Sequence, residues 1–337
     1  GRDLLSRTAE NLFWLGRYTE RAETVLRVLR AALNRLIEDG GPDRQPALLE
    51  TLLSVHIATD PATPSDHRQR IASAVERLLH APEPPYGMRS SLDGCRRNAT
   101  LARGVLSQDG WWILNNLFND RRWRRSQRSV MAAAPIDIVN HGIHELVAFA
   151  GTAAENMTRN YAWRFLDIGK RLERALQMVE LTEALTHKRS TDVDESLALT
   201  ALLEIGDSYM TYRSRYAVTP MAVPVLDLLI LDESNPRSLA CQLVALESHL
   251  AALPHDGPYR SPSLRKVLGL LTEVRLADPD RLAEDDGGAR LAAFFAKARA
   301  DLTPISELLG RAYFVLAETP TSTFAMRREE TAEAIEH

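Results

Sequence analysis

LFWLGRYTERAETVLRVL, residues Leu12–Leu29, is matched further along the chain by FLDIGKRLERALQMVELT, residues Phe165–Thr182. Each segment places a glycine, a basic residue, two variable residues and then Glu-Arg-Ala in the same order. The two glycines, Gly16 and Gly169, are 153 positions apart in a chain of 337 residues. This near-repeat predicts two related halves that each contribute one Glu-Arg pair to a shared site, because charged pairs within apolar helices are costly unless they are paired or used.

The hydrophobic pattern around these segments is helical. Apolar residues recur at helical spacing from about Ser6 to Glu38, and no clear run of alternating β-branched residues occurs elsewhere in the chain. We therefore predict an all-α fold: a single multi-helix, bundle-like body with an internal pseudo-repeat. The body covers residues 1–320, with pseudo-halves at about 1–155 and 156–320, and a polar C-terminal tail covers residues 321–337.

Two later helices are predicted with stated limits. The stretch Val193–Tyr216 is predicted to be one continuous helix. A further helix is predicted to start at Pro236, because proline suits the first helical position.

Composition excludes several classes of function. The chain is 45% hydrophobic and 26% charged with a net charge of −4, so no global field favours nucleic acid or an anionic membrane. No apolar run is long enough to span a membrane, and the N-terminal residues lack a signal-peptide pattern. The two cysteines, Cys95 and Cys241, lack ligand spacing. We expect a cytoplasmic protein without a metal, and no cofactor is predicted because no glycine-rich phosphate loop appears.

The Glu-Arg segments allow two interpretations. On a helical wheel Arg21 points towards the core side of its helix, and a buried guanidinium needs carboxylate or carbonyl partners. In the first interpretation, the pairs brace two central helices, Arg21 with Glu173 and Arg174 with Glu20. In the second, a pocket between the halves binds a carboxylate or phosphate through basic side chains, with Glu20 or Glu173 as a general base. These basic side chains are Arg17, Arg21, Lys170 and Arg174.

Several motifs together resemble the Alpha-E family, a bacterial domain named for its helices and its Glu-Arg motif. The resemblance begins with SRTAENLFWLGRYTERAE at Ser6–Glu23 and extends beyond residue 310. The other motifs that carry it are Ser107–Trp111 (SQDGW) with Asn115, Met157–Trp163 (MTRNYAW), Phe165–Arg174 (FLDIGKRLER), Asp207–Arg213 (DSYMTYR) with Tyr216, and Asn235–Ser238 (NPRS). The second copy departs from the first, with Asp167 and Lys170-Arg171 where the first has Trp14 and Arg17-Tyr18.

The resemblance implies a cellular context more than a reaction. Members are typically encoded beside, or fused to, circularly permuted ATP-grasp ligases, often with a transglutaminase-like protease nearby. This context implies that the chain is the helical partner of an ATP-grasp amide or peptide ligase in the biosynthesis of small peptides or metabolites. It would bind, and possibly transfer or condense, an amino-acid-like, peptide or acyl-phosphate intermediate.

The predicted site follows from the two motifs and the resemblance. Glu20 and Glu173 would handle protons, and the substrate would be bound by Arg7, Asn11, Arg17, Arg21, Lys170, Arg174, Tyr212 and Arg213. The tyrosines of the Asp207–Tyr216 stretch would equally suit hydrogen bonds across a helix interface. The alternative function is a non-catalytic interaction scaffold whose Glu-Arg pairs are structural salt bridges. The substrate, the reaction and the oligomeric state are not predicted.

Two further signals are weaker. Arg121–Arg125 with Arg128 encloses Trp123, a pattern that suits a phosphate backbone or tRNA, but a solvated helix end is the preferred interpretation in an arginine-rich, acidic chain. His141-x-x-His144-Glu145 has imidazoles one turn apart but matches neither common zinc pattern. Nucleic acid and metal are therefore not expected ligands.

Overall fold

The computed structural model describes residues 2–38, 43–57, 66–83, 85–124, 134–186, 194–216, 219–284 and 288–314. The predicted polar tail, residues 321–337, lies outside the described residues.

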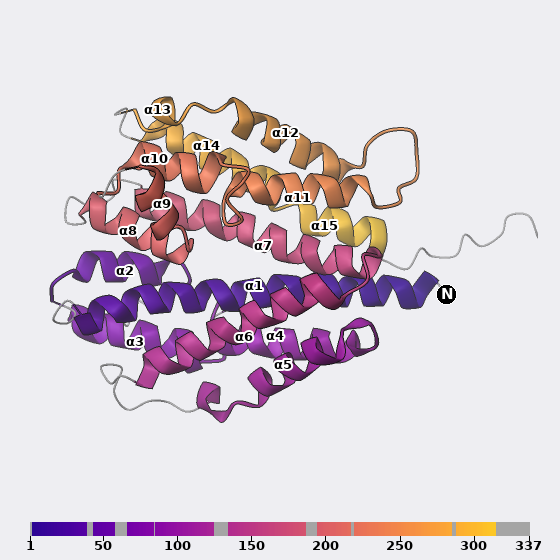
Figure 1. Ribbon diagram of the computed structural model, residues 1–337, viewed down its shortest axis with the longest axis horizontal. Helices are drawn as coiled ribbons and strands as arrows, with labels where there is room; N and C mark the ends of the chain where they lie inside the picture. Colours follow the sequence, from indigo (N-terminus) through magenta and orange to yellow (C-terminus); the bar gives the residue numbers. More distant parts are fainter. Residues whose placement is uncertain are drawn as a thin grey trace, which may run out of the picture.

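All regular elements in the described ranges are helical, which confirms the predicted all-α fold (Figure 1). The first part of the chain forms α1 (Arg2–Glu38), α2 (Pro46–Ser54), α3 (His67–His80), α4 (Met88–Leu101), η1 (Arg103–Val105), α5 (Gln108–Asn119), η2 (Arg121–Arg124) and α6 (Ala134–Asn156). The remainder forms α7 (Tyr161–Thr186), α8 (Glu195–Ile205), α9 (Tyr209–Arg215), α10 (Ala222–Leu226), η3 (Asp227–Leu231), α11 (Leu239–Ala251), α12 (Pro262–Leu276), α13 (Pro279–Leu282), α14 (Ala289–Leu302), α15 (Ile305–Leu309) and η4 (Gly310–Phe314).

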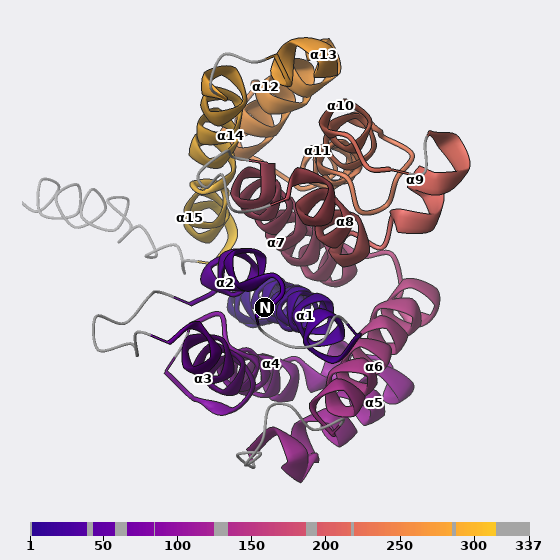
Figure 2. The same ribbon diagram turned by 90° about the vertical axis from the view of Figure 1, so that its left-hand side faces the viewer.

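Helix α1 lies at the centre of the molecule. In the end-on view of Figure 2, α2, α4, α6 and α7 surround it. Helices α3, α4 and α5 lie on one side of α1, α7 to α15 lie on the other, and α6 crosses α1 obliquely in this view (Figure 1). Residues spread over its whole circumference are buried, including Leu12, Phe13, Leu15 and Ala22. A helix that is buried all round lies in the core of its domain, which agrees with the apolar residues on several faces of α1.

The second layer packs on α7. Helices α11 and α14 contact α7, and α12 covers α11 and α14 from outside. Helices α1 and α7 thus form the shared interior of the two sides. The predicted pseudo-repeat of the two halves as wholes is not confirmed. Among the described residues, no helix is both long enough and apolar enough to cross a bilayer.

Two predicted helix limits were wrong. The helix predicted over Val193–Tyr216 is broken into α8 and α9, because Asp207 adopts a left-handed backbone conformation with φ 49° and turns the chain. Helix α11 begins at Leu239 rather than Pro236, since the Ser238 hydroxyl caps it by accepting a hydrogen bond from the Cys241 amide at 3.0 Å.

Candidate functional site

Helices α1 and α7 run in the same direction and touch backbone to backbone at Gly16 and Gly169. A Cβ atom on Gly16 would lie 2.1 Å from the carbonyl oxygen of Leu166. One on Gly169 would lie 2.0 Å from the carbonyl oxygen of Phe13. Only glycine permits such a close approach of two backbones. This contact brings the two Glu-Arg pairs, which follow one turn later on each helix, face to face.

The two Glu-Arg pairs bind each other reciprocally. Arg174 donates from Nε and Nη2 to the two carboxylate oxygens of Glu20, at 2.6 and 2.7 Å. Arg21 donates to the two oxygens of Glu173, at 2.9 and 3.2 Å. Both are bidentate, the geometry in which guanidinium and carboxylate bind most specifically. The bracing of two central helices, predicted as the first interpretation of the motif, is confirmed.

The Glu173 end of this arrangement is closed. Arg17 donates a third charged hydrogen bond to Glu173, and it also donates to the Ser306 hydroxyl at 2.5 Å. Gln177 adds a longer hydrogen bond to Glu173 at 3.3 Å. Glu173 is 1% exposed. Burial favours its neutral form, but the charges of Arg17 and Arg21 prevail and lower its pKa.

Aromatic rings cover the arginines at this end. The guanidinium of Arg21 lies 4.6 Å from the ring centre of Tyr86 and 5.3 Å from that of Tyr18. The guanidinium of Arg17 lies 5.7 Å from the ring centre of Trp14. Cation–π contacts and apolar cover leave these arginines with little surface for a ligand.

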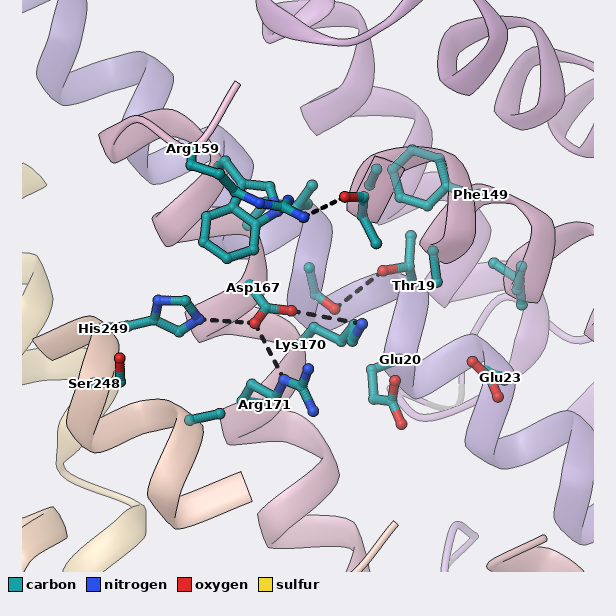
Figure 3. A pocket seen from close by; sticks show the side chains of 18 residues that line it. Thr19, Glu20, Glu23, Phe149, Arg159, Asp167, Lys170, Arg171, Ser248 and His249 are labelled. Atoms are coloured by element: carbon teal, nitrogen blue, oxygen red, sulfur yellow. Dashed lines mark hydrogen bonds and ion pairs between the residues drawn. The ribbon is translucent and has the colours of Figure 1, made fainter. Parts of the chain in front are cut away.

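The Glu20 end opens into a pocket of about 360 Å³ between α1, α6, α7 and α11 (Figure 3). Its polar wall comes from α1, α7 and α11, while α6 supplies an apolar wall. The polar and charged lining residues are Thr19, Glu20, Glu23, Arg159, Asp167, Lys170, Arg171, Ser248 and His249. The apolar and small lining residues are Gly16, Leu146, Phe149, Ala150, Ala153, Ala154, Trp163, Leu166 and Ala245.

The difference between the two ends follows from the departure between the sequence copies. Trp14 and Tyr18 of α1 correspond to Asp167 and Arg171 of α7. The aromatic pair lies by the arginines of the closed end, whereas the charged pair lines the pocket. The closed end and the open end thus differ at two corresponding positions of each helix, which are aromatic on α1 and charged on α7.

Asp167 is the centre of the polar wall. Its Oδ2 lies 2.8 Å from His249 Nε2 and accepts a hydrogen bond from Arg171 Nε at 3.1 Å (Figure 3). His249 Nδ1 lies 3.3 Å from Arg164, which can only donate, so Nδ1 accepts and the ring proton sits on Nε2 facing Asp167. Burial would raise the pKa of Asp167, but the His249 hydrogen bond and the charges of Arg171 and Lys170 hold it well below its usual range.

Lys170 carries a weakly paired charge at the pocket. The one ion pair of its Nζ is with Asp167 Oδ1 at 3.5 Å, within the described part of the chain. Burial lowers the pKa of Lys170, and the nearby Arg174 and Arg171 lower it further, while Asp167 opposes the shift. A destabilised ammonium group beside a cavity is prepared to accept an anionic partner.

Glu23 lies one turn after Glu20 and forms part of an extended charge network. It accepts hydrogen bonds from Arg27 Nε at 2.8 Å and from Arg237 Nη2 at 2.5 Å. Arg237 also lies 3.7 Å from Glu20. Burial would raise the pKa of Glu23, but Arg237, Arg174 and Arg27 lower it from 4.5 to about 2. Glu23 is therefore ionised at neutral pH.

Of the predicted site residues, the structure places Glu20 and Lys170 at the pocket. Arg174 lies behind Glu20 as its partner, and Arg17, Arg21 and Glu173 lie at the closed end. The other four predicted residues do not line this pocket: Arg7, Asn11, Tyr212 and Arg213. Tyr212 is fully buried, and its hydroxyl accepts from the Met221 amide at 3.0 Å, which fits the helix-interface alternative.

Several pocket residues were not predicted. Glu23 lies three residues after Glu20 on the same helix face, and this i, i+3 spacing is the sequence signal that could have identified it. His249, Ser248 and Phe149 come from α6 and α11, whose position against α7 has no signature in the sequence.

The weaker sequence signals remain outside the site. Trp123 is 2% exposed and packs in the core, so it is not available to stack on a base. The side chains of Arg124, Arg125 and Arg128 lie outside the described residues. His141 lies 3.8 Å from Asp120. Across the described ranges, no three His, Cys, Asp or Glu residues gather in a way that could hold a metal ion.

The fold and site define an all-helical domain in which two central helices exchange Glu-Arg pairs beside one open pocket. The chain belongs to the Alpha-E family, described as a predicted α-helical domain with a conserved ER motif, and matches it over residues 4–314. The reciprocal ion pairs explain the Glu-Arg motif of this chain structurally, because they join α1 to α7.

The curated relatives are mycobacterial. Uncharacterized proteins of Mycobacterium tuberculosis and Mycobacterium bovis are each 28% identical to this chain over 321 residues, which covers 90% of this chain and 36% of the relative. The chain thus spans about a third of the length of the curated relatives it matches. No solved structure matches the chain significantly.

Proposed function

We propose that the pocket at the Glu20 end binds an amino-acid-like molecule or small peptide for an ATP-grasp amide ligase. The observation that carries this proposal is the difference between the surroundings of the two Glu-Arg pairs. Glu173 is enclosed by arginines and aromatic rings, whereas Glu20 borders a cavity with a weakly paired lysine. The ligase partnership itself rests on the family resemblance.

The charges of the pocket suit a zwitterion. Lys170 offers an ammonium group for the ligand's carboxylate, and Glu20 with Glu23 offers carboxylates for its amine. The apolar wall, with Phe149 and Leu146, suits an aliphatic or aromatic side chain. A few convergent polar groups against an apolar wall are typical of small-molecule sites.

The finer part of the proposal is condensation in this pocket. The ligase would form an acyl phosphate with ATP, and the amine nitrogen of the second substrate would attack its carbonyl carbon. A C–N bond forms, the C–O bond to phosphate breaks, and phosphate leaves with the electron pair. Glu20 would accept the proton from the attacking nitrogen, and Lys170 would bind the departing phosphate. Glu173 would support this step only by holding Arg21 and Arg17.

Calorimetric titration of the wild-type chain with free amino acids and dipeptides tests binding. Lys170→Met should weaken the binding of the best ligand by about tenfold or more, because it removes a weakly paired cation from the polar wall of the pocket. Lys266→Met is the matched control, since Lys266 pairs with Asp301 at 3.2 Å away from the pocket. Equal affinities for both variants would refute binding at this pocket.

A second assay tests the partnership. The chain and a circularly permuted ATP-grasp ligase, the kind of partner that the family resemblance implies, are mixed with ATP and the ligand, and the amide product is followed by mass spectrometry. Product should require both proteins and fall with Lys170→Met but not with Lys266→Met. Product formed by the ligase alone, at the same rate, would refute the partnership.

The second candidate function is a non-catalytic interaction scaffold. It is favoured by the closed Glu173 end, where the Glu-Arg pair serves only to brace α1 against α7. In that case the ligase would bind this chain in a pull-down assay, and Lys170→Met would leave both complex formation and product formation unchanged.

A further inference from the structure

A second pocket, of about 280 Å³, lies beside α1 near the break between α8 and α9. Its lining residues are Arg27, Arg30, Ala31, Asn34, Leu203, Glu204, Asp207, Tyr209 and Met210. None of them lines the Glu20 pocket, so the two cavities are separate. The question is which ligand its charges would accept.

Arg27 presents an unused donor to this pocket. Its Nε is bound to Glu23 at 2.8 Å, but its Nη1 is buried and has no hydrogen bond to any residue that the structure describes. The nearest carboxylate oxygen, on Asp207, lies 3.6 Å from this nitrogen, too far for a hydrogen bond. The Asp207 side chain is 67% exposed, so water screens this contact. A buried guanidinium nitrogen without an acceptor is a costly arrangement that an anion would relieve.

Arg30 lies one turn further along the same face of α1. Within the described part of the chain it forms no hydrogen bond and no ion pair, although it is half-buried. Burial lowers the pKa of Arg30, and the like charge of Arg27 lowers it further. Two like charges one helical turn apart destabilise a helix unless a counter-charge lies between them.

The carboxylates of this pocket supply only part of that counter-charge, because Asp207 and Glu204 raise the pKa of Arg30 without reversing its net lowering. Glu204 accepts a hydrogen bond from Arg35 at 2.7 Å. Asp207 is held at the helix break by its left-handed backbone, with φ 49°, and stays at a distance from Arg27. Asn34 adds a neutral amide donor to the same space.

We propose that this second pocket binds a small oxyanion, a phosphate or carboxylate group, between Arg27 and Arg30. Planar guanidinium groups bind both kinds of group with paired hydrogen bonds. The ligand would occupy the acceptor position that Arg27 Nη1 lacks and would neutralise Arg30. This site does not depend on the function proposed for the Glu20 pocket.

The test is titration of the purified chain with inorganic phosphate and, separately, with acetate, followed by calorimetry at low ionic strength. Saturable binding of at least one anion is expected, and Arg30→Gln should weaken it about tenfold or more through loss of a charge-assisted contact. Arg103→Gln, which removes an exposed arginine on η1, is the matched control and should bind as the wild type does. Preference for phosphate over acetate, or the reverse, identifies the group.

A second variant and a control outside both pockets complete the test. Asn34→Asp places a negative charge in the second pocket without replacing either arginine and should also weaken binding, with circular dichroism confirming that the helices are intact. Lys266→Met removes a lysine that lines neither pocket and should leave anion binding unchanged. The proposal fails if neither anion binds the wild type, if Arg30→Gln binds as tightly as wild type, or if Lys266→Met weakens binding as much as Arg30→Gln does.

Discussion

Glu20 and Glu173 occupy equivalent positions of two paired helices, yet Glu173 is enclosed by two arginines while Glu20 borders a pocket. Each glutamate accepts a bidentate arginine from the other helix, so the motif first of all joins α1 to α7. The pocket borders Glu20 and not Glu173, so a ligand in this pocket would reach the Glu20 end of the motif. The Glu-Arg motif therefore has a structural role at both ends and faces a pocket at one.

The glycine contact should be intolerant of the smallest side chain. Gly16→Ala and Gly169→Ala each place a methyl group about 2 Å from a backbone oxygen that cannot move aside. We expect each to lower the free energy of unfolding by about 3 kcal/mol or more, or to prevent folding, because overpacking against backbone forces the helices apart. Urea unfolding followed by circular dichroism measures the effect.

The control for this prediction is Gly151→Ala. Gly151 lies within α6 with nothing within 4 Å of its added Cβ, so alanine should stabilise the chain by about 1 kcal/mol through helix propensity. Equal effects at Gly16 and Gly151 would contradict the tight crossing.

Glu173→Gln should act on stability. It leaves Arg17 and Arg21 in a buried site without a carboxylate, and we expect a loss of about 3–5 kcal/mol in the free energy of unfolding. Ligand affinity of the folded protein should change little, because Glu173 does not line the pocket. A variant of wild-type stability that has lost its ligand would instead place Glu173 in the chemistry.

His56 should make the chain sensitive to mild acid. Both its ring nitrogens are buried and have no hydrogen-bond partner among the described residues, and burial lowers its pKa from 6.5 to about 4. Between these values the unfolded chain binds a proton that the folded chain does not. Stability present above pH 6.5 is therefore lost as the pH falls towards 4, by about 3 kcal/mol in all.

His56→Phe tests this dependence. Phenylalanine keeps a ring against Tyr86, whose ring centre lies 6.0 Å from that of His56 and is tilted by 14°. Unfolding midpoints in urea, measured from pH 7 to pH 4, should fall less steeply for the variant than for the wild type. Parallel curves would show that His56 does not titrate as its burial requires.

Glu23 should make the stability of the fold depend on pH in a more acidic range than His56 does. Its arginine partners lower its pKa from 4.5 to about 2, so the stability it contributes is complete above pH 4.5 and is lost as the pH falls towards 2. Glu23→Gln should be less stable than wild type by about 3 kcal/mol at neutral pH, and the difference should narrow below pH 4.5. Thermal unfolding across this range measures it, and a constant difference would contradict the assignment.

The pairing of α1 with α7 could be predicted from the sequence because each of the two segments carries its own glycine and Glu-Arg pair. Helical spacing, one glycine and one Glu-Arg pair on each segment are enough to propose which charges meet. The same reasoning did not reach Arg237 as a partner of Glu23, or His249 as a partner of Asp167. Those contacts depend on how α11 and its preceding turn pack on α7, which no spacing encodes. Tyr212 lies away from the Glu20 pocket, in the helix that follows the break at Asp207.

The glycine contact fixes the central helix pair but leaves most of the pocket walls outside it. Because α1 and α7 are locked backbone to backbone, neither helix can slide to accommodate a different ligand. The apolar wall belongs to α6 and part of the polar wall to α11, which lie outside that contact. Substitutions there can alter what the pocket selects while the central pair stays the same. Homologues that share the Glu-Arg motif can thus differ in the walls of this pocket without changing the contact between α1 and α7.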